Sequence, residues 1–218
     1  MTTSDYFCYE ETFNDLNFEN IGSGGDRWYL QTKSNLTWIT VQDELTNADI
    51  TKIKFCGNHA VFDDAVVGSS NKVNSDIRIS QVSWLPPNSY NDWLYRKLTG
   101  IVNDVNNSFF EYDLEFIETL QFTKYVGTVD SYYGKHTDPR IGDVLEPKHR
   151  KLSFVVQLSD PKDYEGGDLV LHFGEPHIVP KRKGDIVFFP SHTLHEVTPV
   201  TKGTRYTLVG WVCGDKMK

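Results

Sequence analysis

The stretch GGDLVLHFGEPHIVPKRKGDIVFFPSHTLHEVTPVTKGTRYTLVGWVC, residues 166–213, decides the fold of this chain. Short runs of alternating apolar and polar residues follow one another in it, and turn residues such as Gly174 separate the runs. Many short strands at regular spacing, with turn signals between them, are typical of an all-β sandwich or barrel. Gly166 and Gly167 indicate a turn with positive φ angles, which glycine adopts without steric cost.

The residues before about 111 have a different pattern. Thr46 is expected to cap a helix at about 47–56, and Asp49 completes a capping box with it. A second helix is predicted for DWLYRKLTGIVNDVNNSFF, residues 92–110, where apolar residues recur at helical spacing. Between the two helices, SDIRISQVSWL alternates like a single strand. We therefore expect a helical layer packed on a β-sandwich.

Nothing in the chain resembles a linker that would divide it. The 218 residues, 39% of them hydrophobic, suit one domain with a substantial core. We expect an N-terminal extension over 1–44, a support layer of helices and strands over 45–110, and the β core over 111–213.

Charge and cysteine content restrict the possible partners and compartment. A net charge of −8 leaves no basic stripe for a phosphate backbone, so nucleic acid is not expected as a partner. The three cysteines are far apart in sequence, which favours free thiols in a reducing compartment. No secretory signal or membrane-length apolar run is visible, so we expect a cytoplasmic protein without a membrane partner. The sequence does not indicate an oligomeric state.

The sequence YYGKHTDPR, residues 132–140, contains a candidate metal-binding pair. On a strand, His136 and Asp138 would project from the same face with Cα atoms about 6.6–7 Å apart. One imidazole and one carboxylate at that spacing can reach the same ion. With a second imidazole they would form the facial triad of non-haem Fe(II) oxygenases, which leaves other coordination positions open.

Two histidines in one turn compete to be the third ligand. His195 begins an alternating run after the apolar run GDIVFFP and the turn SHTL, whereas His192 lies within that turn and is expected in the loop. His195 is therefore the preferred ligand. Arg205 follows it by ten residues and opens the last predicted strand. Its planar guanidinium could bind a carboxylate through two hydrogen bonds.

These motifs, in this order and at this spacing, resemble those of the Fe(II)/2-oxoglutarate-dependent dioxygenases, in the prolyl 4-hydroxylase-like superfamily. The resemblance covers roughly residues 45–212 and is densest in the core H-x-x-x-P-V-x-x-G-x-R, which starts at His195. The runs LSDPKDYEGGDLVL and FFPSHTLHEVTPVTKGTRY look especially like the bacterial and phage peptidyl-prolyl hydroxylase branch, in which arginine replaces lysine. The resemblance implies a double-stranded β-helix, or jelly roll, fronted by helices.

The resemblance also assigns roles to individual residues. It implies that His136, Asp138 and His195 are iron ligands and catalytic residues, and that Arg205 binds the distal carboxylate of 2-oxoglutarate. Tyr133 would donate its phenol to that carboxylate. Three further candidates come from their place in the chain: Tyr125, on the preceding strand, for lining the cosubstrate pocket, Arg140, in the loop after the metal pair, for holding substrate, and Trp211, on the same strand face as Arg205, for the same role.

The cofactors implied are Fe(II), 2-oxoglutarate as cosubstrate and O₂, with ascorbate as an aid that related enzymes use to rescue oxidised iron. The implied reaction hydroxylates an unactivated C–H bond and releases succinate and CO₂. A peptidyl proline is the expected target. A free amino acid or another small molecule is an alternative, because the motifs build only the iron and cosubstrate sites. A catalytically silent, cupin-like metal-binding module is the non-enzyme alternative. A silent relative would usually lack one of His136, Asp138, His195 and Arg205, and all four are present.

Overall fold

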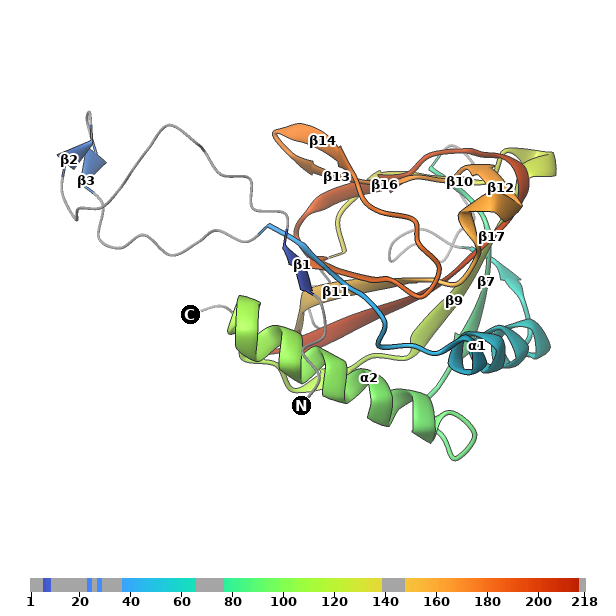
Figure 1. Cartoon of the computed structure of the whole chain (residues 1–218), viewed down its shortest axis with the longest axis horizontal. Coiled ribbons are helices and arrows are strands. Elements are labelled where there is room, and N and C mark those ends of the chain that lie inside the picture. Colours follow the sequence, from blue (N-terminus) through green and yellow to red (C-terminus); the bar gives the residue numbers. More distant parts are fainter. Residues whose placement is uncertain are drawn as a thin grey trace.

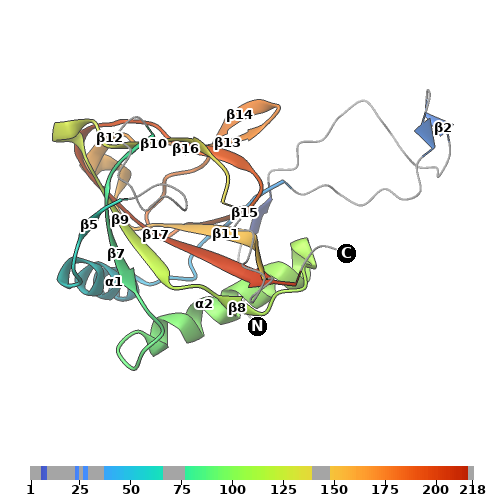
Figure 2. The same cartoon turned by 180° about the vertical axis from the view of Figure 1, so that it is seen from behind.

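Two antiparallel sheets face each other and form a jelly roll in the computed structural model of the chain. The structure describes residues 37–65, 77–138 and 148–215, and the backbone of three short strands before them. Helices α1 and α2 cover one side of the larger sheet, and the smaller sheet lies on its other side (Figure 1). The view from behind shows the same three layers (Figure 2). The fold expected from the sequence is confirmed.

The larger sheet has its strands in the order β1-β4-β15-β11-β17-β9-β7-β5, with β12 and β8 also paired to β17. Its long strand β17 pairs with β11 on one side and β9 on the other. The strands are β1 (Tyr6–Cys8), β4 (Ile39–Val41), β5 (Asp63–Asp64), β7 (Gln81–Leu85), β8 (Phe116–Ile117), β9 (Leu120–Val126), β11 (His149–Gln157), β12 (Tyr164–Gly166), β15 (Ile186–Pro190) and β17 (Val200–Gly214).

The smaller sheet has the order β14-β13-β16-β10-β6. Its strands are β6 (Arg78–Ile79), β10 (Tyr132–His136), β13 (Leu169–Phe173), β14 (Glu175–Ile178) and β16 (Leu194–Val197). Two further strands, β2 (Ser23–Gly24) and β3 (Arg27–Trp28), pair only with each other. The turn predicted at Gly166 and Gly167 is confirmed, with φ angles of 74° and 61°.

The run SDIRISQVSWL forms two strands, not the single strand that its alternation predicts. Arg78–Ile79 pairs with β10 of the smaller sheet, and Gln81–Leu85 pairs with β9 of the larger one. The chain changes sheets at Ser80, between the two strands. A period-2 pattern shows which residues share a face but does not show to which sheet each half belongs.

Helix α1 (Asn47–His59) begins where the sequence predicts and is three residues longer. Its capping box is present: the backbone N–H of Asp49 donates to the Thr46 hydroxyl, and the N–H of Thr46 donates to the Asp49 carboxylate. Helix α2 covers Asp92–Val105 and passes into a π-helical turn, so the predicted helix changes type before it ends at residue 110. Two short 3₁₀ turns lie elsewhere, at Gly127–Val129 and Pro161–Asp163. No helix in the described ranges is long and apolar enough to cross a membrane.

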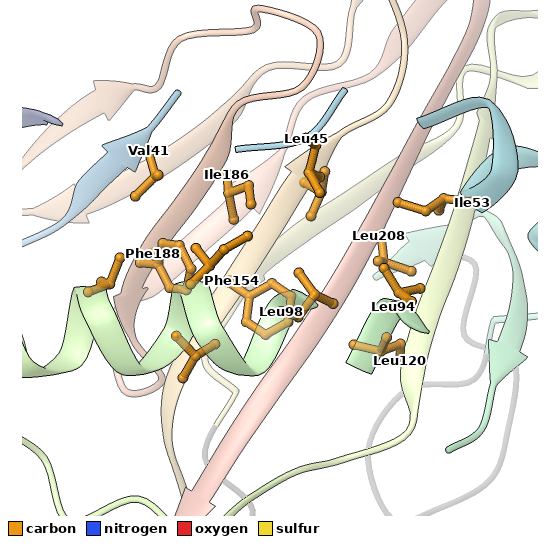
Figure 3. Packing of buried hydrophobic residues seen from close by; sticks show 14 of the residues in the cluster. Val41, Leu45, Ile53, Leu94, Leu98, Leu120, Phe154, Ile186, Phe188 and Leu208 are labelled. Atoms are coloured by element: carbon orange, nitrogen blue, oxygen red, sulfur yellow. The ribbon is translucent and has the colours of Figure 1, made fainter. Parts of the chain in front are cut away.

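The main hydrophobic core lies between the two helices and the larger sheet (Figure 3). Leu94 and Leu98 of α2 and Ile53 of α1 meet the strand residues Phe154 and Leu208, and all five are nearly fully buried. This apolar layer fixes the outer face of β11 and β17. Their inner face is therefore turned toward the smaller sheet.

The inner face carries most of the polar residues that the strands bury. On β11, Ser153 and Gln157 lie opposite Trp211 and Thr207 of β17. Ser153 and Gln157 are 0% and 1% exposed, although apolar neighbours surround them in sequence. Burying polar side chains is costly unless they have partners, so this face is where a functional site is expected.

Candidate metal centre

His136, Asp138 and His195 converge between the two sheets, and their candidate ligand atoms all lie within 4.8 Å of one another. His136 and His195 are directly paired residues of neighbouring strands β10 and β16. Asp138 follows the end of β10 by two residues, and its backbone N–H donates to the carbonyl of Ser191. Two imidazoles and a carboxylate on one side of a shared centre form a set of donors that suits Fe(II) and leaves coordination positions open.

Hydrogen bonds orient both imidazoles. Nδ1 of His136 lies 2.8 Å from the carbonyl oxygen of Gly134, and Nδ1 of His195 lies 2.9 Å from that of Thr193. A carbonyl only accepts, so each Nδ1 carries the proton and each Nε2 presents a lone pair. The Nε2 atoms lie 3.7 Å and 3.6 Å from the two carboxylate oxygens of Asp138. Both rings thus present the atom that binds a metal to the same place.

A chain of two serines holds the Asp138 carboxylate. The hydroxyl of Ser153 donates to Oδ2 of Asp138 at 2.8 Å and lies 2.9 Å from the hydroxyl of Ser191. Because Ser153 has only one hydroxyl hydrogen, Ser191 must donate to Ser153. Both serines are fully buried. Such outer hydrogen bonds fix the orientation of a ligating carboxylate.

The electrostatics of the site favour neutral imidazole. Burial lowers the pKa of His136 to about 4, and the neighbouring His195 contributes to the lowering. The ring of Tyr133 stacks on that of His136 with centroids 3.5 Å apart. Burial also raises the pKa of the Tyr133 phenol, so that it remains a donor at neutral pH. His136 is therefore ready to bind a metal without first losing a proton.

A second polar group lies on the same inner face, around Arg205. Its guanidinium is 1% exposed, donates from Nη2 to Oε1 of Gln157 at 3.1 Å and lies over the Tyr125 ring at 5.3 Å. No carboxylate of the described residues pairs with it. Its Nε and the Nε2 of Gln157 are buried without a hydrogen-bond partner in the described part of the chain. A buried cation is costly when unpaired, so these residues fit an anionic group.

The two polar groups are arranged in sequence along one strand. Ser153, which holds Asp138, and Gln157, which contacts Arg205, are four residues apart on β11 and so about 13 Å apart along it. 2-Oxoglutarate has a metal-binding keto acid at one end and an anionic carboxylate at the other, so the two groups of residues fit its two ends.

Gly167 provides room for the Arg205 side chain. Its φ angle is +61°, and a Cβ at this position would lie 2.9 Å from Cδ of Arg205 and 2.7 Å from Cγ2 of Val200. Any other residue would be strained in this conformation and would push on the arginine.

Two more buried donors lie beside the metal centre. Arg78 of β6 is 5% exposed, stacks on Tyr133 at 4.3 Å and leaves Nη2 without a partner among the described residues. Trp211 of β17 is 6% exposed and lies opposite Ser153, and its Nε1 has no partner in the same ranges. Arg150 stacks on the Trp211 ring at 3.8 Å. These side chains present unpaired donors from two different sheets.

The structure brings together the three predicted ligands, and it places Tyr133 against them. Tyr125 is buried beside Arg205, and Trp211 faces the site, as its position in the strand predicts. His192 is exposed and is not part of the cluster. Arg140 lies outside the described residues.

Sequence reasoning missed four residues of the site: Ser153, Ser191, Gln157 and Arg78. One signal was available for two of them. In KLSFVVQLS, Ser153 and Gln157 are four residues apart and so lie on the same face of the strand, and the residues between them are apolar. Polar residues on the buried face of a strand indicate a site. Nothing local marks Ser191 or Arg78, which reach the site only through the strand order.

Comparison with known proteins agrees with this geometry. Residues 120–213 match the family model of the 2OG-Fe(II) oxygenase superfamily. A PKHD-type hydroxylase of Idiomarina loihiensis is 40% identical over 82 residues. That match covers 37% of this chain and 36% of the relative, so the chain matches only about a third of the relative's length.

Two solved structures share the fold. A prolyl-4-hydroxylase of Pseudomonas putida superposes with a TM-score of 0.62 at 23% identity, covering 83% of this chain and 94% of that one. A Trichoplax adhaerens prolyl hydroxylase, solved in complex with a hypoxia-inducible factor peptide fragment, has a TM-score of 0.66 at 16% identity and covers 81% and 83%. At these identities the likeness establishes the fold alone.

Proposed function

Because residues 120–213 match the family model of the 2OG-Fe(II) oxygenase superfamily, we propose that this chain is an Fe(II)- and 2-oxoglutarate-dependent dioxygenase that hydroxylates a peptidyl proline. The observation that carries the proposal is the presence of two polar groups between the two sheets. One has two imidazoles and a carboxylate within 4.8 Å of one another, and the other has a buried arginine without a carboxylate partner in the described ranges.

His136, Asp138 and His195 would hold the iron. When bound, iron, 2-oxoglutarate and O₂ together supply the oxidising chemistry that releases succinate and CO₂ and leaves an oxygen atom for the substrate. Three protein donors on one side of the ion leave the positions that the cosubstrate and O₂ need. The hydrogen bonds from the two imidazoles to backbone carbonyls keep the Nε2 lone pairs directed at the ion.

Arg205 would bind the distal carboxylate of 2-oxoglutarate. Its burial makes that ion pair stronger than one in water, and the ring of Tyr125 covers one side of the guanidinium. Tyr133 would donate its phenol to the same carboxylate. Its ring stacks on His136, so it would also help to orient the imidazole and exclude water.

The buried donors beside the metal support a peptide substrate. A peptide backbone offers carbonyl acceptors at regular intervals, and Nη2 of Arg78 and Nε1 of Trp211 are donors without a partner in the described ranges. The curated relative is named a hydroxylase, and the two solved neighbours are named prolyl hydroxylases. Trp211 is a proposed substrate residue on these grounds.

A free amino acid would use the same metal and cosubstrate sites. Its carboxylate could pair with Arg78, whereas a peptide would place a neutral carbonyl there. The two candidates therefore differ in their response to Arg78→Gln. This change removes the charge that a carboxylate needs, but it keeps an amide donor for a carbonyl.

The direct test is mass spectrometry of reactions with a proline-rich peptide library and, in parallel, with free proline. We expect a mass gain of one oxygen atom in a peptide, with succinate released in step. A product from free proline alone would instead support the small-molecule alternative. Absence of substrate-stimulated succinate in both would count against the proline assignment.

The metal and cosubstrate roles have a separate test. Anaerobic Fe(II) with 2-oxoglutarate should give a weak visible charge-transfer band. His136→Ala and Asp138→Ala should abolish the band, and Arg205→Ala should shift it to higher 2-oxoglutarate concentration with little change in iron binding. A band that persists in the two ligand variants would contradict the assignment of the metal site and favour another ligand set. A silent metal-binding module would bind the metal but give no 2-oxoglutarate-dependent band.

A further inference from the structure

Gln157 is the one residue whose side chain donates to or accepts from Arg205 in the described part of the chain. Its Oε1 accepts from Nη2 of the arginine at 3.1 Å, and the side chain is 1% exposed. The backbone of Gln157 is anchored at both ends: its N–H donates to the carbonyl of Asp185, and its own carbonyl accepts from the N–H of Gly184. The amide is therefore held at a fixed place on β11.

This contact determines which way the amide points. Arginine only donates, so the amide oxygen must face Arg205 and the NH₂ group must face away from it. That Nε2 is buried and has no partner among the described residues, and the same is true of Nε of Arg205. Leaving a buried donor unsatisfied costs free energy, so two such donors in one pocket indicate that a ligand group completes them.

The neutrality of Gln157 also matters. A glutamate at this position would form an ion pair with Arg205 and cancel its charge within the pocket. A glutamine accepts one arginine hydrogen bond and leaves the positive charge in place. The pocket as built has one positive charge, no carboxylate partner within the described ranges, and free donors on two side chains.

We propose that Gln157 is a cosubstrate-contacting residue that selects keto acids ending in a carboxylate. Its Nε2 donates a hydrogen bond to the same distal carboxylate that Arg205 binds, while its Oε1 orients the guanidinium. This inference rests on the proposed function, because it assumes that 2-oxoglutarate occupies the pocket. It adds Gln157 to Arg205 as a second residue that contacts the distal carboxylate. It also makes the selectivity for a carboxylate depend on an uncharged side chain at position 157.

The experiment compares 2-oxoglutarate with its 5-methyl ester. The two have the same metal-binding keto-acid end, but only the first has a charged tail. Binding is measured by anaerobic calorimetry on the Mn(II)-loaded full chain, so that no turnover is required. The variants are Gln157→Glu, Gln157→Met, which removes the hydrogen bonds while keeping the length, and the control Gln81→Glu. Gln81 is exposed on β7, so the control makes the same charge change away from the pocket.

The wild type should bind 2-oxoglutarate far more tightly than the ester. Gln157→Glu should weaken 2-oxoglutarate binding by about 100-fold and leave binding of the ester little changed, because it removes a donor and neutralises Arg205. Gln157→Met should weaken 2-oxoglutarate binding by about 10-fold through the lost hydrogen bond alone. Gln81→Glu should match the wild type for both ligands.

The possible failures have different meanings. If Gln157→Glu binds 2-oxoglutarate like the wild type, or weakens both ligands equally, Gln157 does not select the carboxylate and the inference is wrong, although the proposed function stands. If the wild type binds Mn(II) but no 2-oxoglutarate, the proposed function fails and the inference fails with it. Gln157→Met decides the same question should the glutamate variant not fold.

Discussion

Removal of the Ser153 hydroxyl tests how far the metal centre depends on its surroundings. In Ser153→Ala, Oδ2 of Asp138 loses a donor at 2.8 Å, and the hydroxyl of Ser191 loses its acceptor. Ser153 is fully buried, and the hydroxyl of Ser191 lies 2.9 Å from that of Ser153. The carboxylate is then free to rotate away from the two imidazoles.

The size of the effect follows from the kind of bond removed. A hydrogen bond to a charged group contributes about 1.5–3 kcal/mol. Loss of an outer-shell partner typically weakens metal binding by about 10- to 100-fold, which corresponds to about 1.4–2.7 kcal/mol. The two ranges overlap, so the dissociation constant for Mn(II) should rise by about 10- to 100-fold in Ser153→Ala.

Anaerobic calorimetry with Mn(II) measures this directly, and thermal unfolding of the metal-free protein separates binding from folding. Ser83→Ala is the matched control, because Ser83 is also fully buried and its hydroxyl donates to the carbonyl of Gly57, in the helical layer. It should lose stability and keep its metal affinity. An unchanged dissociation constant in Ser153→Ala, or an equal loss in Ser83→Ala, would refute the reasoning.

Three further predictions concern packing, backbone conformation and pH. Gly57→Ala should lower the free energy of unfolding by about 1–3 kcal/mol in urea titration, because the new methyl would overlap the buried ring of Phe122; a rise would contradict this packing. Gly167→Ala should weaken 2-oxoglutarate binding more than metal binding in calorimetry, because its Cβ would press on Arg205 at a strained φ of +61°. Burial lowers the pKa of His136 from 6.5 to about 4, so the unfolded chain takes up this proton first as the pH falls. The free energy of unfolding of the metal-free protein should therefore keep the contribution of this neutral imidazole above pH 6.5 and should fall by up to about 1.4 kcal/mol per pH unit between pH 6.5 and 4. His136→Asn should show a shallower fall when denaturant titrations are made at each pH.

Local patterns in the sequence were sufficient for the start of both helices, for the alternating runs of the β core and for the first set of site residues. The capping box at Thr46 and Asp49 and the alternating runs of the β core depend on residues close together in the chain, so short-range rules predict them. The pair His136 and Asp138 was visible for the same reason. His195 became the third candidate from its place in an alternating run, and the structure confirms that it joins the pair.

Only the tertiary structure decided which distant residues meet. Alternation did not show that the chain changes sheets at Ser80, because both halves of the run have the same period. Ser153 and Ser191, and likewise Gln157 and Arg205, are in contact because antiparallel pairing sets their strands in register across 38 and 48 positions of sequence. The sequence determined most of the strands and the candidate metal ligands. Strand order and register determined the hydrogen bonds that orient those residues, since a hydrogen bond depends on distance in space and not on distance along the chain.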